Sequence, residues 1–255
     1  MKAEETHQER NQELGEGIRP ERNGELVASR PHLLVFFGIV AAVAVAGHMA
    51  QHRPGSGTDL VETHAHAIPI YLSAAFMDWL LALFVWKGIR RRGVSIRSLV
   101  QGRWATPRDI LRDLGIAALF WGILLAANWG MERMMGPGQE KSLGTLLPRT
   151  AADVMAWILA SASGGFCEEL VFRGYLQRQL RALSGSVSIA VLSQGIVFAL
   201  MHAYQGWLPV IQIGIIGVLF GTLAVWRKTL RPGMIAHGWF DIWAGWLGHV
   251  IAARV

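Results

Sequence analysis

The sequence predicts an all-α membrane protein, a polytopic bundle of about seven transmembrane helices. The chain has 255 residues, of which 52% are hydrophobic and 16% are charged, and its mean hydropathy is +0.33. An ordinary soluble domain carries about 25% charged residues. Apolar runs close to the roughly 20 residues that cross a bilayer occur at Leu33–Ala50, Ala67–Trp86, Leu114–Trp129, Ala151–Val171, Val187–Ala203, Leu208–Trp226 and Met234–Ala252.

The basic residues predict how these helices lie in the membrane. The formal net charge is +6, and the positive-inside rule places clustered basic residues in the cytoplasm. The N-terminus is then cytoplasmic and the C-terminus lies outside. The excess of basic residues therefore indicates membrane topology and contact with anionic lipid, and not binding to nucleic acid. The clusters that carry this prediction are Lys87/Arg90/Arg91/Arg92, Arg178/Arg181 and Arg227/Lys228/Arg231.

Three regions are predicted along the chain. Residues 1–30 carry seven Glu and five Lys or Arg with few apolar residues, which is typical of a disordered cytoplasmic tail. Residues 31–150 are predicted to form peripheral transmembrane helices and loops. Residues 151–255 are predicted to form the core, because most of the intramembrane charge lies there. Thr106-Pro107-Arg108-Asp109 has the capping hydroxyl, first-turn proline and acid of a helix start.

Several isolated polar residues favour structural interpretations. Glu62, His64 and His66 could bind a metal weakly, but alternate spacing does not place them on one helical face, so we expect a solvated loop. Asp78, inside the second predicted span, needs a polar partner, and we expect a structural role for it. Cys167 is the single cysteine, so an intramolecular disulfide is excluded and packing is its expected role.

The first polar cluster, Cys167-Glu168-Glu169-Leu170-Val171-Phe172-Arg173, lies inside an apolar run. Each ionisable group in hydrocarbon costs at least ~2.5–3.5 kcal/mol, so the cluster needs partners, water or a function. On a helix, Glu169 and Arg173 are i, i+4 neighbours that can form an ion pair. Glu168 points about 100° away from Glu169 and is free to act as a base or a ligand. A purely structural network is the other interpretation.

Two further clusters contain histidine, at Phe198-Ala199-Leu200-Met201-His202 and at His237-Gly238-Trp239-Phe240-Asp241. A turn at 183–186 would bring Glu168 and His202 to the same depth of a helical hairpin. His237 lies only six residues after basic Arg231, so a tilted helix, a buried loop or a break must bring it to that depth. Gly164-Gly165 is a plausible position for a break.

Together the three clusters resemble the signature of the CAAX-type prenyl-protein endopeptidases and their prokaryotic relatives, the CPBP or Abi family. That signature is Glu-Glu-x-x-x-Arg, then Phe-x-x-x-His, then His-x-x-x-Asn/Asp, on separate transmembrane helices. It matches this chain, in order, at Glu168-Glu169…Arg173, Phe198…His202 and His237…Asp241. The resemblance covers about 151–252 and implies an intramembrane protease in a bacterial cytoplasmic membrane. A membrane protein or a lipidated peptide is the implied substrate.

The resemblance also implies roles for individual residues. Glu168 would activate water with His202, while His237 and Asp241 would stabilise the tetrahedral oxyanion, with Glu169, Arg173 and Phe198 in support. Eukaryotic members have Asn where this chain has Asp241, and an ionised Asp cannot donate a hydrogen bond. Either Asp241 is protonated, or His237 donates while Asp241 orients it. The second alternative is preferred here.

The sequence leaves the need for a metal and the function class open. The family resembles a metal-independent glutamate protease, which implies no cofactor, and we prefer that reading. The alternative is zinc held by Glu168, His202 and His237, an oxygen and nitrogen ligand set with one open position. The alternative function is a non-enzymatic transporter, scaffold or immunity protein that uses the same polar cluster.

Overall fold

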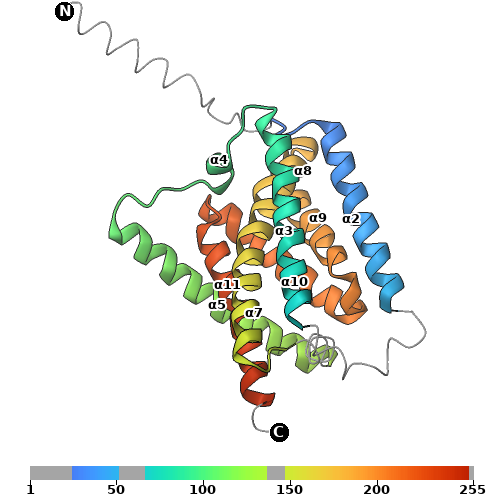
Figure 1. Ribbon diagram of the computed structural model, residues 1–255. Helices are drawn as coiled ribbons and strands as arrows, with labels where there is room; N and C mark the ends of the chain where they lie inside the picture. Colours follow the sequence, from blue (N-terminus) through green and yellow to red (C-terminus); the bar gives the residue numbers. More distant parts are fainter. Residues whose placement is uncertain (1–24, 52–66, 137–146, 253–255) are drawn as a thin grey trace, which may run out of the picture.

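The computed structural model describes residues 25–51, 67–136 and 147–252, and within these ranges every regular element is helical (Figure 1). Most of the predicted tail, the segment with Glu62, His64 and His66, and residues 137–146 lie outside the described residues. The all-α prediction is confirmed for the described part of the chain.

Five helical segments in the described ranges are long and apolar enough to cross a membrane. The protein is therefore an integral membrane protein. The segments are α2 (Arg30–Gln51), α3 (Ala67–Arg90), α5 (Pro107–Met135), the continuous stretch Ala151–Ser184, and α10 (Trp207–Arg227).

The prediction of about seven spans holds only in part. α9 (Val187–Met201) is apolar but has 15 residues, fewer than a full crossing needs. α11 (Arg231–Ala252) has 22 residues but is not among the segments apolar enough to qualify, and it contains both His237 and Asp241. The two helices that fall short are thus ones that carry predicted site residues.

The start of α5 follows from its local sequence. The Thr106 hydroxyl accepts from the backbone N–H of Asp109, the Asp109 carboxylate accepts from the N–H of Thr106, and Pro107 occupies the first turn. This reciprocal capping box satisfies two backbone donors that a helix leaves open. In Figure 1, α5 (green) runs obliquely to the other helices.

The stretch Ala151–Ser184 consists of α7 (Ala151–Glu168), a π-helix η2 (Glu169–Leu176) and α8 (Gln177–Ser184). The predicted break at Gly164-Gly165 is wrong, because α7 continues through both glycines. A Cβ on Gly165 would lie 2.7 Å from the backbone nitrogen of Gly238, so this glycine permits close approach of α11. The irregularity comes four residues later, as a π-helix of the kind found at functional sites.

The basic clusters meet at one end of the bundle, around the short helix α4 (Ile96–Val100). The Arg178 guanidinium donates to the carbonyls of Ser98 and Leu99 at 3.0 and 2.7 Å. The backbone N–H of Leu230, in the turn between α10 and α11, donates to Val100 O at 2.9 Å. Thr229 and Leu230 in this turn are buried, whereas Lys228 is exposed. The contact with Val100 holds the start of α11 against α4.

α2 and α3 share one hydrophobic core with η2. The core includes Phe36 from α2, Val85 from α3 and Tyr175 from η2, each fully buried. His32 of α2 links the three helices, with Nδ1 2.9 Å from the Tyr175 hydroxyl and Nε2 3.1 Å from the Phe84 carbonyl. Because a carbonyl only accepts, Nε2 donates and Nδ1 is left to accept from Tyr175.

Candidate active site

A buried ion pair forms the base of the site. Arg173 NH1 lies 2.9 Å from Glu169 Oε1, and the two side chains are 0% and 1% exposed. The guanidinium carbon lies 4.4 Å from the ring centre of Phe198 and 5.1 Å from that of Phe220, and NH2 donates to Gly217 O. The pair allowed by the i, i+4 spacing is therefore present, and the aromatic faces complete its surroundings.

His237 lies where three carboxylates meet. Its Nδ1 is 3.1 Å from Glu169 Oε1, within hydrogen-bond range. Its Nε2 is 3.5 Å from Glu168 Oε2 and 3.6 Å from Asp241 Oδ2. Carboxylate oxygens therefore face both ring nitrogens, and they favour a ring that donates from both sides.

The group that orients His237 differs from the one preferred in the sequence analysis. The i, i+4 spacing favoured Asp241, yet the imidazole donates its hydrogen bond to Glu169, 68 positions earlier in the chain. The distance from His237 to Asp241 is longer than a hydrogen bond. Glu169 thus contacts both Arg173 and His237, a double role that helical spacing could not indicate.

His202 approaches the site from the other side of Phe198. It is the residue that caps α9, and its Nδ1 donates to the Phe198 carbonyl at 2.9 Å. The Phe198 ring lies 4.9 Å from the His202 ring and 6.2 Å from the His237 ring, measured between centres. Among the described residues, no hydrogen bond or ion pair joins His202 to Glu168 or His237.

Asp78 and Trp157 were not assigned to the site by sequence reasoning. Asp78 Oδ2 and Asp241 Oδ2 would lie 3.7 and 3.9 Å from a Cβ built on Gly164, so both carboxylates border the space left by this glycine. The Trp157 indole N–H donates to the backbone carbonyl of Asp241 at 2.7 Å. A carboxylate inside an apolar helix was a signal for Asp78, whereas nothing in the sequence indicated Trp157.

The candidate zinc ligands do not form a metal site. In the described ranges, no group of three or more His, Cys, Asp and Glu side chains is arranged to hold a metal ion. Glu168 and His237 are neighbours, but in the described residues no hydrogen bond or ion pair joins His202 to either of them. The residues therefore do not fit the Glu168, His202 and His237 ligand set, and no step below involves a metal.

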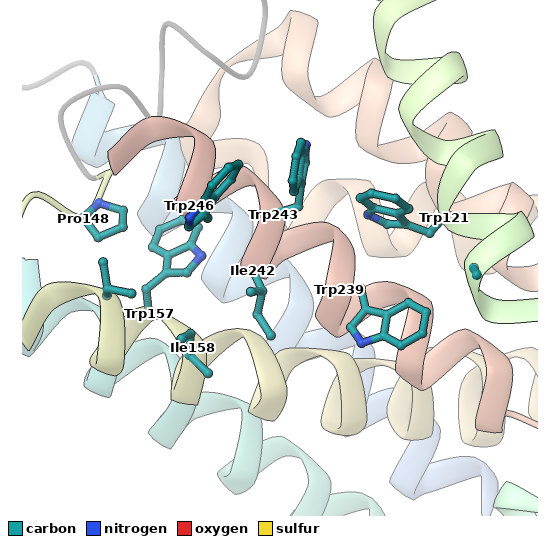
Figure 2. Close-up of a pocket in the computed structure, with 11 residues that line it drawn as sticks. Trp121, Pro148, Trp157, Ile158, Trp239, Ile242, Trp243 and Trp246 are labelled. Carbon is teal, nitrogen blue, oxygen red and sulfur yellow. The ribbon is translucent and has the colours of Figure 1, made fainter. Parts of the chain in front are cut away.

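An aromatic pocket of about 370 Å³ adjoins the site between α5, α7 and α11 (Figure 2). Figure 2 shows Trp157 of α7 beside Trp246 of α11, with Trp121 of α5 on the opposite side. The same Trp157 donates to the Asp241 carbonyl, so the pocket and the polar site share a wall. The five indoles that line the pocket belong to Trp121, Trp157, Trp239, Trp243 and Trp246.

Comparison with known families matches residues 150–243 to the family described as Rce1-like, the type II CAAX prenyl endopeptidases. No curated protein and no solved structure gives a significant match to this chain. The matched segment includes all three motifs, from Glu168 to Asp241, and excludes Asp78. The resemblance drawn from those motifs is confirmed: residues 150–243 form a domain of the Rce1-like type II CAAX prenyl endopeptidase family, and membership of that family implies a membrane protease.

Proposed function

We propose that this protein is an intramembrane endopeptidase that hydrolyses a peptide bond near the membrane surface, in CAAX-type processing of the C-terminus of a membrane-anchored substrate. The observation that carries the proposal is the position of His237, whose Nε2 faces Glu168 and Asp241 while its Nδ1 bonds to Glu169. A buried imidazole with this set of acidic neighbours has the groups that peptide hydrolysis needs, a base for water and a donor for the developing oxyanion.

Glu168 is the proposed general base. Its side chain is 20% exposed, while that of Glu169 is 1% exposed and paired with Arg173. Glu168 takes a proton from water, whose oxygen attacks the carbonyl carbon of the substrate, and the carbonyl becomes an oxyanion. The same proton then passes to the leaving nitrogen as the C–N bond breaks, which yields a carboxylic acid and an amine, and transfer of the acid proton to the amine gives the final carboxylate and ammonium.

His202 assists Glu168 through its second nitrogen. Because Nδ1 donates to the Phe198 carbonyl, the neutral ring has its lone pair on Nε2. An acceptor at Nε2 can hold the second hydrogen of the attacking water. The water would lie between Glu168 and His202, which is consistent with the absence of a direct bond between them in the described residues.

His237 and Asp241 are the proposed oxyanion donors, and Glu169 and Arg173 support them. Glu169 holds Nδ1 of His237, which fixes the ring plane. Arg173 offsets the charge of Glu169, so the π-helix adds little net charge beside the developing oxyanion. Donors fixed before the reaction stabilise a transition state more than donors that must reorient.

The aromatic pocket favours a substrate with a large apolar part. A pocket lined by five indoles can bury a large apolar group of a substrate away from water. We therefore propose a membrane protein or a lipidated peptide as the substrate. The basic end of the bundle is proposed to face the cytoplasm, in a bacterial cytoplasmic membrane, with the N-terminus on the same side.

The test is cleavage by the purified full-length protein in lipid vesicles. The probes are a quenched fluorescent peptide with a farnesylated cysteine followed by three residues, and the same peptide without the lipid. Glu168→Gln should lower the rate about 10²–10⁴-fold, the usual contribution of a general base. Glu132→Gln on α5, whose carboxylate accepts from Asn128 at 2.7 Å, is the matched control.

The outcomes of this experiment test the enzyme, the role of Glu168 and the need for a lipid separately. Cleavage by the wild type and by Glu132→Gln, with loss in Glu168→Gln, supports the proposed enzyme. Failure of the wild type to cleave either peptide opposes CAAX-type processing. Equal rates for the wild type and Glu168→Gln remove Glu168 as the base. Equal rates on the two peptides oppose a requirement for a lipidated substrate.

A further inference from the structure

Asp78 is an intramembrane carboxylate that the matched family domain does not include. It lies in the middle of α3, where the basic residues Lys87 and Arg90 are more than two turns away. Among the described residues, no hydrogen bond or ion pair reaches its carboxylate. A charged group at the centre of a bilayer is costly, so a carboxyl in this position without a cation requires a proton or another partner.

The neighbouring residue fixes the face of α3 that carries Asp78. The Trp79 indole N–H donates to Ser163 Oγ at 3.2 Å, and its ring stacks on Phe166 with centres 5.7 Å apart. Both partners belong to α7, which packs along α3. Asp78 is therefore fixed beside Gly164, the residue that follows Ser163.

Gly164 opens a space between two carboxylates from different helices. A Cβ on this glycine would lie 3.7 Å from Asp78 Oδ2 and 3.9 Å from Asp241 Oδ2, and no other atom would approach it within 4 Å. The two carboxylates thus border the same gap. Asp78 is brought there by α3 and Asp241 by α11, and both of these helices pack against α7.

The charges around this gap are predominantly negative. Asp78 lies within electrostatic range of Glu168 of α7 and of His237 and Asp241 of α11. Cys167 of α7 and Tyr204 of η3 (Ala203–Gln205) also lie within range of its charge. Asp241 in turn is within range of Glu169 of η2. Glu169 is offset by Arg173, which leaves three carboxylates around one imidazole.

We propose that Asp78 is a positioning residue that shares one proton with Asp241 across the space at Gly164, and so keeps Asp241 able to donate a hydrogen bond to the oxyanion. The proposal rests on the proposed protease function for its catalytic consequence. Two carboxyl groups that border one site of low dielectric cannot both remain charged at little cost, and they commonly hold one proton between them. The proton is exchanged only between the two carboxyls, and no other reactant is required.

The first test is the pH dependence of peptide cleavage in lipid vesicles. In Asp78→Asn, the like charge that keeps the proton on Asp241 is gone. The pH above which activity falls should therefore be lower than in the wild type by about 1 pH unit. Asp78→Glu keeps the charge and should restore the wild-type profile. A uniform loss of activity at every pH, with no shift, is the result of a purely structural role and would overturn the proposal.

A second variant interrupts the pair without changing either acid. Gly164→Ala places a methyl group at ordinary contact distance from both carboxylates, so the fold accepts it, but the methyl fills the shared space. It should shift the alkaline limb in the same direction as Asp78→Asn while the melting temperature stays equal or rises. Gly115→Ala on α5, where a Cβ meets nothing within 4 Å, is the control. An unshifted profile in Gly164→Ala opposes the pair.

The third measurement does not depend on activity. Infrared spectroscopy of the full-length protein in vesicles at neutral pH should show the carbonyl stretch of a protonated carboxyl group, and the pH at which this band disappears should be lower in both Asp78→Asn and Asp241→Asn. An unchanged pH dependence of the band in either variant, or its absence in the wild type, overturns the shared proton. If the bands behave as expected but the wild type cleaves no peptide, the protease function fails and the carboxyl pair stands.

Discussion

The two adjacent glutamates of this protein occupy opposite kinds of environment. Glu169 is closed off: it is 1% exposed, paired with Arg173 at 2.9 Å, and bonded to His237 at 3.1 Å. Glu168 is open: it is 20% exposed, and its nearest charged neighbour is His237 at 3.5 Å. One step along the chain therefore separates a carboxylate whose charge is offset from one that is available to a substrate or to water.

The adjacent glycines repeat this difference one turn earlier in α7. Gly165 is closed, because α11 backbone atoms fill the position of its side chain, while Gly164 is open toward Asp78 and Asp241. The closed residues hold α7 and η2 against their neighbours. The open residues face the space in which we place the reaction. One face of this helix therefore packs against neighbouring helices, and the other carries the residues to which we assign catalysis.

The largest expected effect is on the closed glutamate. Glu169→Gln leaves Arg173 buried without its counter-ion, and breaking a buried pair costs about 3–5 kcal/mol. We expect a much lower melting temperature in lipid vesicles, whereas Glu168→Gln should melt close to the wild type. Similar melting temperatures for the two variants, with equal loss of cleavage, would remove the distinction between the closed and open acids.

A double variant sharpens that result. Glu169→Gln combined with Arg173→Met removes both charges, so no unpaired ion is left in the core. Buried pairs replaced together are often neutral in stability, and the double variant should therefore melt above either single variant. Strictly additive losses in this cycle would show that the two side chains do not interact energetically.

The sequence predicted the closed part of the site better than the open part. The i, i+4 spacing was sufficient for the Glu169–Arg173 pair, and the start of α5 followed from Thr106 and Asp109. Both depend on neighbours within one helical turn. The hydrogen bond that His237 donates to Glu169 and the approach of Asp78 to Asp241 depend on helix packing across 68 or more positions.

The helix count shows another physical limit of sequence reasoning. α9 and α11 carry His202 and His237, and they are the helices that did not qualify as full apolar crossings. In α11, His237 and Asp241 lower the apolar signal of the helix that bears them, whereas α9 is apolar and falls short in length, because it ends at Met201, directly before His202. The π-helix was also missed, because no residue pattern distinguishes the π-helical turns at Glu169–Leu176 from ordinary α-helix.

An intermediate effect is expected at the closed glycine. Gly165→Ala would place a methyl 2.7 Å from the Gly238 nitrogen and 2.9 Å from the Met234 carbonyl, so α7 and α11 must separate. Overpacking of this kind typically costs about 1–3 kcal/mol. Thermal unfolding in vesicles should report the loss, with Gly122→Ala on α5, where a Cβ meets nothing within 4 Å, as the control. Equal melting temperatures for Gly165→Ala and the wild type would mean that α7 and α11 can separate at little cost in stability.

The smallest expected effect concerns Asp241, the position at which eukaryotic relatives have Asn. Because Glu169 bonds to Nδ1 of His237, the ring keeps its orientation without Asp241, and an ionised carboxylate is not needed for that purpose. Asp241→Asn retains a donor that does not titrate, so cleavage at neutral pH should stay within a few-fold of the wild type and extend further into alkaline pH. Asp78→Asn should shift the alkaline limit of activity in the opposite direction.

Asp241→Ala has no donor and should be slower at every pH. Cleavage rates across pH for the Asn and Ala variants of Asp241 therefore separate hydrogen-bond donation to the oxyanion from orientation of His237. A strong loss in Asp241→Asn would instead assign Asp241 the role of an ionised acceptor that orients His237.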